Sequence, residues 1–295
     1  MVKASNGWEE FKIVASGGGE KLEKWGDVYL LRPDPQAIWS AAFDFSAFRM
    51  LHGKYVRSAS GGGAWEFYKS LPREWTVSYQ NLKFLISPMG FKHVGLFPEQ
   101  AVNWEAVGKL ISKAKREVRV LNLFGYTGGA TVACAYAGAH VTHVYSSRGM
   151  TEVCKRNVEL NGINPERTRY IIEDCAKFVA RELRRGKTYD AIIMDPPSYG
   201  RGANGEVWKI EDDLQPLVDD CVKLLSDVPM FFLINSYTTG LQPTVIKNVL
   251  ERSLTNAKRK GYAIEAFEIG LPTHEKIVLP AGCSALATWK LKEER

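Results

Sequence analysis

From Val118 onward, apolar runs of strand length alternate with longer segments of helical character. Alternation of this kind predicts parallel βαβ units joined by right-handed crossovers. The expected strands are 118–123, 140–145, 168–172, 189–194 and 229–235, followed by two more near 262–269 and 284–291. The expected helices are 129–138, 149–161, 175–186, 211–226 and 242–260, and an apolar stripe predicts a further helix over 98–115.

The first hundred residues follow a different pattern, in which glycines break short β-like runs. The runs are 27–31, 64–68, 75–79 and 84–86, and glycine-rich turns are expected at 16–19 and 60–63. Most of the tryptophans also precede residue 105. We therefore expect a small β-rich domain over residues 1–90, a candidate for substrate binding, and a larger domain over 91–295.

Composition limits the classes of protein. The 295 residues are 45% hydrophobic, which is enough for a sizeable core. No run of about 20 apolar residues predicts a membrane span, and residues 1–10 lack the apolar segment of a signal peptide. We therefore expect a cytoplasmic protein that does not bind a membrane.

The five cysteines and the net charge add little chemistry. No two cysteines form a C-x-x-C pair, so neither a zinc site nor a redox motif is supported, and no metal is expected. An odd number of dispersed cysteines fits reduced, buried thiols. The net charge of +6 permits a phosphate-rich partner without demanding one, because the basic runs 113–116 and 258–260 also suit the C-terminal ends of the expected helices.

Two motifs each follow an expected strand. The first, at residues 124–129, reads Phe-Gly-Tyr-Thr-Gly-Gly, and the second, at residues 195–199, reads Asp-Pro-Pro-Ser-Tyr. Glycine permits tight turns and close approach of a ligand, and ligands of parallel sheets bind at the carboxyl ends of strands. The dinucleotide spacing G-x-G-x-x-G does not occur in the first motif, which disfavours NAD.

In this order the two motifs resemble the first and fourth motifs of class I S-adenosylmethionine-dependent methyltransferases. The first motif, with Asn122 before it, is similar to that of a bacterial ribosomal RNA large-subunit methyltransferase family, which also has a Gly-x-Phe-x-x-Gln element, here Gly95 to Gln100. The resemblance covers residues 90 to 240. It implies an α/β fold, a Rossmann-like, seven-stranded, mostly parallel sheet beside the small β-rich N-terminal domain, and S-adenosyl-L-methionine as the cofactor.

The resemblance also implies a set of cofactor-binding positions, in which 124–129 surround the methionine part and Asp174 and the backbone of Cys175 contact the adenine. Asp174 also suits the N-cap of the following helix. The expected cofactor-binding residues are Gln100, Asn122, Phe124, Tyr126, Thr127, Gly128, Gly129, Tyr145, Ser147, Asn157, Asp174, Cys175 and Asp195.

Tyr145 departs from the family pattern, which has an aspartate at the end of the second strand to hold the ribose hydroxyls. A single phenol hydroxyl cannot bridge both oxygens as a carboxylate does. Losing a charged hydrogen-bond partner costs on the order of 1.5–3 kcal/mol. We expect a weakened or altered ribose site.

The expected catalytic residues are Asp195, Pro196, Pro197, Ser198 and Tyr199. The prolines fix the backbone, so that Asp195 and nearby carbonyls can position an acceptor for in-line methyl transfer. Related motifs serve nitrogen methylation, although here Ser198 separates the prolines from the aromatic residue. Carbon-5 methylation of cytosine uses a cysteine nucleophile, which family members carry near the end of the fifth strand, where 233–238 has none.

The glycine-rich segment 200–209 follows the second motif. It is expected to be a loop that either closes over the substrate with Trp208 as a base-stacking residue or packs Trp208 into the core. The leading hypothesis is methylation of RNA, ribosomal RNA foremost, at a nitrogen or oxygen. The alternatives are a degenerate, non-catalytic cofactor or RNA binder, and a methyltransferase that acts on a small molecule or a protein. The oligomeric state stays open.

Overall fold

The computed structural model describes residues 1–58, 62–201, 205 and 207–290. The chain divides into two compact units. One unit consists of Met1–Val2, Asn103–Glu268 and the segment from Gly282 onward, and the other of Lys3–Val102 and Ile269–Ala281. We call them the sheet unit and the N-terminal unit, and describe each by itself.

The sheet unit contains most of an eight-stranded sheet of order β1-β16-β17-β15-β12-β9-β10-β11. Its central strands pair in parallel, from β15 through β12, β9 and β10 to β11, whereas β17 runs antiparallel to β15. The mixed α/β class with a mostly parallel sheet is therefore confirmed, and β1 adds one strand to the seven expected. The strands are β1 (Val2–Ala4), β9 (Arg119–Leu123), β10 (His140–Val144), β11 (Thr168–Ile171), β12 (Ala191–Met194), β15 (Phe231–Ser236), β16 (Tyr262–Pro272) and β17 (Val278–Trp289).

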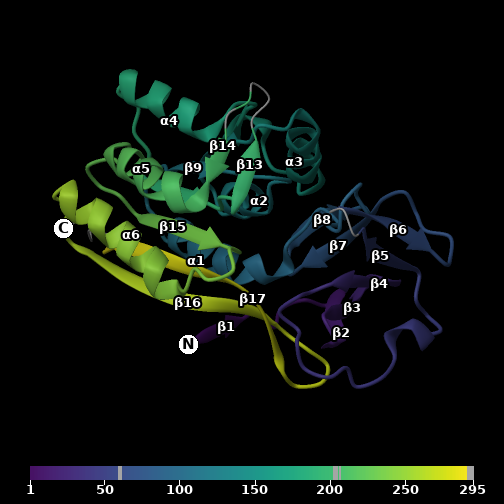
Figure 1. The fold of residues 1–295 in the computed structure, drawn as a ribbon. Coiled ribbons are helices and arrows are strands. Elements are labelled where there is room, and N and C mark those ends of the chain that lie inside the picture. Colours follow the sequence, from purple (N-terminus) through teal and green to yellow (C-terminus); the bar gives the residue numbers. More distant parts are fainter. Residues whose placement is uncertain (59–61, 202–204, 206, 291–295) are drawn as a thin grey trace. The chain divides into compact units, whose positions relative to one another are not determined.

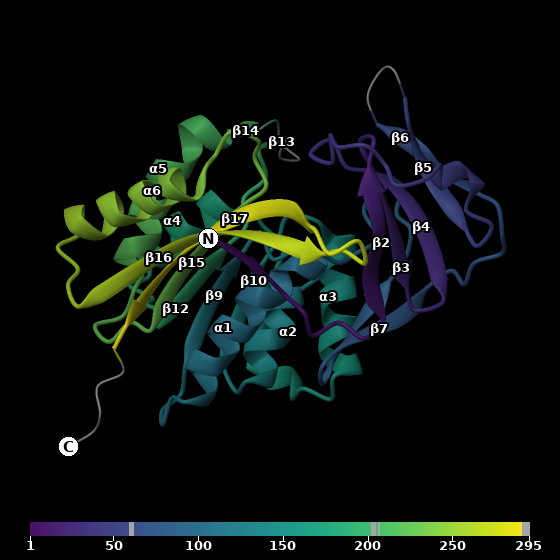
Figure 2. The same ribbon diagram turned by 90° about the horizontal axis from the view of Figure 1, so that it is seen from below.

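Helices cover both faces of this sheet (Figure 1 and Figure 2). One layer contains α1 (Ala101–Ser112), α2 (Gly129–Tyr136) and α3 (Arg148–Leu160), and the other contains α4 (Cys175–Arg184), α5 (Ile210–Lys223) and α6 (Pro243–Asn256). The chain passes from β9 to β10 on one side and later to β12 on the other. This reversal of strand order at β9 is the topological switch point, where open α/β sheets bind ligands.

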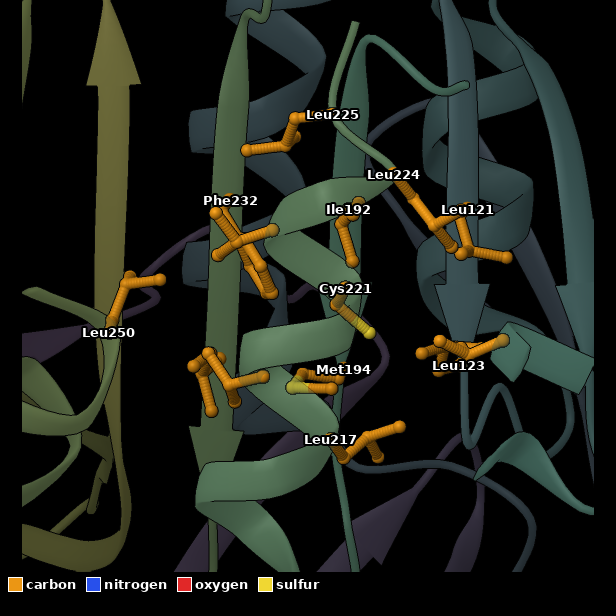
Figure 3. Close-up of a cluster of buried hydrophobic side chains, with 14 of the residues drawn as sticks. Leu121, Leu123, Ile192, Met194, Leu217, Cys221, Leu224, Leu225, Phe232 and Leu250 are labelled. Carbon is orange, nitrogen blue, oxygen red and sulfur yellow. The ribbon is translucent and has the colours of Figure 1, made fainter. Parts of the chain in front are cut away.

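The main core lies between the sheet and the layer of α4, α5 and α6. Figure 3 shows Leu121, Ile192 and Phe232 projecting from three neighbouring strands towards Cys221 and Leu217 of α5. These strands carry near-continuous apolar runs because both of their faces are buried. The apolar runs that predicted these strands therefore reflect burial of both faces.

A short hairpin, β13 (Tyr199–Arg201) and β14 (Val207–Lys209), occupies part of the segment that was expected to be a loop. That expectation is wrong for the described residues, since three residue pairs form an antiparallel ladder. The run is too short and too rich in glycine to show a strand period. Gly202, Ala203, Asn204 and Glu206 of the expected loop lie outside the described residues.

The N-terminal unit is built mainly from a five-stranded sheet of order β2-β3-β4-β5-β6 and a separate hairpin, β7 and β8. Its core includes Ala15, Leu22, Leu31, Phe45 and Leu51. The strands are β2 (Phe11–Gly17), β3 (Glu20–Trp25), β4 (Val28–Pro33), β5 (Gly53–Arg57), β6 (Gly63–Phe67), β7 (Trp75–Tyr79) and β8 (Leu82–Ile86); the short helices in the chain are η1 (Phe45–Ala47), η2 (Pro98–Gln100) and η3 (Pro165–Arg167).

The segment Ile269–Ala281 belongs to the N-terminal unit although it comes from the far end of the chain. The backbone N–H of His274 donates to the carbonyl of Ile13 (3.0 Å), and the N–H of Ser16 donates to Glu275 Oε2 (3.1 Å). This return of the chain and the division after residue 102 differ from the boundary expected after residue 90, because such long-range contacts leave no local pattern. Among the described residues, no helix is long and apolar enough to cross a membrane.

Candidate functional site at the carboxyl ends of the strands

The turn after β9 has an unusual backbone. Phe124 and Tyr126 both lie in the left-handed region, with φ of 57° and 49°, a conformation that costs a non-glycine residue on the order of 1–2 kcal/mol. Two hydrogen bonds hold it: the N–H of Gly125 donates to the carbonyl of Val144 (3.1 Å) and that of Phe124 to Cys175 Sγ (3.3 Å). The turn after β9 is thus anchored to the ends of β10 and α4.

Three glycines of this turn are needed by the protein's own packing. A Cβ on Gly125 would collide with the ring of His143, and one on Gly128, whose φ is 87°, would collide with Cys154 Sγ. A Cβ on Gly129 would lie 2.6 Å from Cζ2 of Trp104. The expectation that these glycines also admit a ligand stays a prediction, and the structure shows that each of them makes room for a buried side chain.

A buried polar network lies beneath the turn. Asn122 Nδ2 donates to Thr131 Oγ1 (2.8 Å), and Thr131 Oγ1 lies 2.9 Å from Nδ1 of His143. Burial lowers the pKa of His143 to about 4, so the imidazole is neutral near pH 7. Asn122 therefore bonds to a buried side chain of the protein and lies beneath the turn.

Thr127 and Asn157 are also buried. Asn157 Nδ2, from α3, donates to the backbone carbonyl of Thr127 (2.9 Å). Ser147 stands at the N-cap of α3 and accepts a long hydrogen bond from the N–H of Met150 (3.5 Å). Of these three expected cofactor residues, Asn157 and Thr127 tie α3 to the turn, and Ser147 caps α3 itself.

Tyr145 directly follows β10 and is half-buried. Its ring meets that of Tyr126 edge-on, with centroids 6.0 Å apart. The pKa of Tyr145 is raised above its ordinary value, first by burial and then by the nearby Cys175 and Asp195. The hydroxyl therefore stays protonated.

Asp174 and Cys175 lie where α4 begins. Asp174 is the N-cap, and its Oδ1 accepts from the N–H of Lys177 (2.9 Å), as the sequence predicts. Cys175 is buried, and burial raises the pKa of its thiol to about 12. The other four cysteines are buried too, and burial likewise raises the pKa of each of their thiols.

A chain of hydrogen bonds runs through the sheet to Asp195. Asn103 Nδ2 of α1 donates to Ser284 Oγ (3.0 Å), and Ser284 Oγ donates to Asn235 Oδ1 (2.9 Å). Asn235 Nδ2 in turn donates to Asp195 Oδ1 (2.9 Å). Asn103, Ser284 and Asn235 are buried, whereas Asp195 is half-buried. We call Asn103, Ser284 and Asn235 the relay residues.

The relay residues are missing from the sequence-based set. A signal exists: Asn235 directly follows the apolar run 231–234 within a central strand, and a buried amide needs partners. The partners themselves, Asn103 and Ser284, are 181 residues apart in the chain, so no local pattern joins them.

The rest of the Asp-Pro-Pro segment is held near the surface. Ser198 Oγ lies 2.7 Å from Thr238 Oγ1, and the indole N–H of Trp208 donates to the carbonyl of Pro197 (2.7 Å). The ring of Trp208 packs on Phe124, with centroids 5.3 Å apart. Trp208 therefore takes the packed position of the two alternatives.

Tyr199 is exposed, and its hydroxyl accepts from Arg201 Nε (2.9 Å). The hairpin register places Tyr199 opposite Lys209 and Arg201 opposite Val207, so these four share one face, and Gly200 and Trp208 share the other. The hairpin thus turns a tyrosine and two cations outward.

Gln100 lies in η2 of the N-terminal unit, and its role toward a cofactor stays a prediction. Among the described residues, no group of three or more His, Cys, Asp or Glu side chains is arranged to hold a metal ion.

Comparisons with known proteins support the resemblance. The chain is 26% identical to ribosomal RNA large subunit methyltransferase K of Neisseria meningitidis, over 77% of this chain and 66% of the relative. It is 35% identical to methyltransferase K/L of Allochromatium vinosum, over 50% of this chain but 19% of the relative. The match thus spans less than two thirds of either curated relative.

A solved structure gives a fuller match. The S-adenosylmethionine-dependent methyltransferase from Agrobacterium tumefaciens superposes with a TM-score of 0.91 and 33% identity, over 98% of this chain and 94% of that one. Residues 34–226 match the model of the S-adenosylmethionine-dependent methyltransferase family. This chain therefore belongs to the S-adenosylmethionine-dependent methyltransferases, with S-adenosylmethionine as its cofactor.

Proposed function

We propose that this enzyme methylates RNA, ribosomal RNA foremost, at a nitrogen or oxygen atom, and that it acts in the cytoplasm. The observation that carries the reaction is the position of Asp195 directly after β12, where Asn235 Nδ2 donates to its Oδ1 (2.9 Å). The names of the curated relatives favour RNA as the acceptor.

The donor groups at the strand ends fit a nucleoside cofactor with one departure. Asp174 offers a carboxylate where an adenine amino group is expected, and the turn 124–129 offers backbone groups to the methionine part. At the ribose, the protonated hydroxyl of Tyr145 replaces a carboxylate and can serve one ribose oxygen at a time. S-adenosylmethionine supplies an activated methyl group, and the protein supplies position.

The relay residues give Asp195 a fixed orientation. Along this chain of hydrogen bonds, Asn103 donates to Ser284, and Ser284 donates to the side-chain oxygen of Asn235. Because that oxygen only accepts, the amide of Asn235 turns its N–H group toward Asp195. A carboxylate held in this way can accept a hydrogen bond from an exocyclic amine or a hydroxyl of the substrate. This bond can keep the lone pair of the substrate nitrogen or oxygen in line with a methyl donor. Asn235 is thus a positioning residue for Asp195.

A cysteine nucleophile has no place in this proposal. Carbon-5 methylation of cytosine uses a cysteine nucleophile, but all five cysteines are buried, and burial raises the pKa of each thiol. The end of β15 presents Asn235 and Ser236 instead. An acceptor with its own lone pair, nitrogen or oxygen, suits such a site.

The test has two arms. Calorimetric titration of S-adenosylmethionine compares the natural chain with Tyr145→Asp and with Tyr145→Phe. Transfer of a radiolabelled methyl group is then measured onto transcribed, unmodified ribosomal RNA. We expect the natural chain to bind and to label RNA, and Tyr145→Phe to bind about 5–10-fold more weakly because it loses one hydrogen bond.

Three outcomes would contradict the proposal. Binding by Tyr145→Asp alone would favour the degenerate, non-catalytic reading. Cofactor turnover with the label in protein or a small molecule would overturn RNA as the substrate. No binding by any of the variants would overturn the proposed cofactor contacts.

A further inference from the structure

Aromatic side chains lie on one side of β5 and β6, two strands that Figures 1 and 2 show side by side in the N-terminal unit. Their antiparallel register sets Tyr55 opposite Trp65 and Gly53 opposite Phe67. Directly opposed residues project from the same face of a sheet. The three rings of this pair of strands therefore lie together.

A glycine supports one of these rings. A Cβ on Gly53 would lie 2.9 Å from Cδ1 of Phe67, so the Phe67 ring lies against bare backbone. Its position is thus set by the strand pair, yet 53% of the residue remains exposed. A large ring that is held in place and still faces solvent is available for stacking.

Trp65 joins this ring to a neighbouring segment. The rings of Trp65 and Phe67 are nearly parallel, at 7° and 6.0 Å between centroids. The indole N–H of Trp65 donates to the carbonyls of Met89 (2.9 Å) and Phe91 (3.3 Å). These bonds bring the backbone of Phe91, a residue that is 43% exposed, beside Trp65.

Two cations border the rings. Arg57 is two residues beyond Tyr55 on β5 and shares its face, and Lys92 follows Phe91. Arg32 Nη1 donates to the backbone carbonyl of Lys92 (3.0 Å), which places Lys92 beside Arg32. The pKa of Lys92 is lowered by burial and then by the positive charges of Lys21, Arg57 and Arg32. Lys21 and Arg32 are neutralised by Asp34 and Glu23.

Arg57 and Lys92 form no ion pair within the described part of the chain. Their charges are therefore available to an anionic partner. Exposed aromatic rings alone would suit many partners, but rings beside unpaired cations suit a chain of bases joined by phosphates.

We propose that Arg57, Trp65, Phe67, Phe91 and Lys92, here called the aromatic face, bind single-stranded RNA. Bases stack on Phe67 and its neighbours, and Arg57 and Lys92 contact phosphates. The inference rests on the proposed methylation of RNA, and gives the N-terminal unit the task of holding the substrate strand.

The experiment measures binding of a fluorescein-labelled, unstructured RNA oligonucleotide to the full chain by anisotropy over a series of salt concentrations. Phe67→Ala should weaken binding about 5–100-fold, the range for loss of one stacked base. Lys92→Gln should reduce the slope of log K against log salt by about 0.7, the value for one phosphate contact on a single strand.

Matched variants control for folding and for charge. Phe43→Ala removes an equally sized, exposed ring elsewhere in the same unit, and Lys12→Gln removes an exposed cation from β2. Both should bind RNA as the natural chain does. Thermal unfolding of all four variants checks that each is folded.

The outcomes separate this proposal from the proposed function. If the natural chain methylates RNA and Phe67→Ala, still folded, binds RNA equally well, the aromatic face is overturned and the function stands. If the control variants lose as much affinity as Phe67→Ala and Lys92→Gln, the face is likewise overturned. If the natural chain neither binds nor methylates RNA, both proposals fail.

Discussion

The two sides of the candidate site are held by different forces. The turn after β9 is fixed by packing, with three glycines pressed against His143, Cys154 and Trp104. The segment after β12 is fixed by hydrogen bonds, from Asn235 to Asp195 and from Trp208 to the carbonyl of Pro197. The first set of contacts is buried, whereas Pro197, Ser198 and Tyr199 are exposed.

The turn after β9 therefore gives the site its shape, and the segment after β12 carries the groups for its chemistry. Close packing leaves the turn one conformation, because cores resist the addition of even a methyl group. Hydrogen bonds near the surface set directions while they leave room for an acceptor. We expect mutations on the turn side to change stability, and mutations on the Asp195 side to change turnover.

The largest effect is expected at Gly128. Gly128→Ala adds left-handed strain and a clash with Cys154, and should lower the free energy of unfolding by about 2–5 kcal/mol. Urea unfolding measures it. Gly162→Ala is the matched control, since Gly162 also has a positive φ, 64°, but open space around it. Equal losses in the two variants would mean that packing does not hold the turn.

His143 provides a pH test of the same side. Because its folded pKa is about 4 against an ordinary 6.5, the unfolded chain binds the extra proton between these values. Stability should therefore fall as the pH drops from 6.5 towards 4, by about 1.4 kcal/mol per pH unit from this group.

Urea unfolding of His143→Gln at pH 7 and at pH 5 isolates this term. The variant should lose part of the pH dependence, and the remainder includes His93, whose pKa burial also lowers to about 4. An unchanged pH dependence in His143→Gln would show that the ring is not neutral beneath the turn.

Asn235→Ala tests the other side. Losing a hydrogen bond to a charged group costs about 1.5–3 kcal/mol, so kcat should fall about 10–100-fold. The dissociation constant for S-adenosylmethionine should stay within about twofold. Asn248→Ala, an exposed asparagine on α6, controls for the substitution. A loss of cofactor affinity with unchanged kcat would contradict the positioning role.

Trp208→Phe should have the smallest effect. It keeps a ring against Phe124 but removes the hydrogen bond to Pro197, for a cost of about 0.5–1.5 kcal/mol, seen as a lower kcat. Trp289→Phe removes a similar indole bond, to the carbonyl of Lys260 (3.0 Å), and should leave kcat unchanged. Equal kcat values in the two variants would show that Trp208 does not help to position the acceptor.

Local patterns were sufficient for much of this molecule. The strands β9 and β15, expected over 118–123 and 229–235, could be read from their apolar runs, and Asp174 at the start of α4 from its capping chemistry. The hairpin of β13 and β14 could not, because its few paired residues show no period. Trp208 left two alternatives open, and its contacts with Phe124 and Pro197 selected the packed one.

The sequence by itself determined the order of the elements, the fold class and the two strand-end motifs, since each depends on residues close together in the chain. The tertiary structure decided what those motifs touch. Asn103, Asn235 and Ser284 meet only because a helix and two strands pack together, and the glycines of the turn face side chains from α1, β10 and α3. Such contacts depend on distances in space, which separations along the chain do not encode.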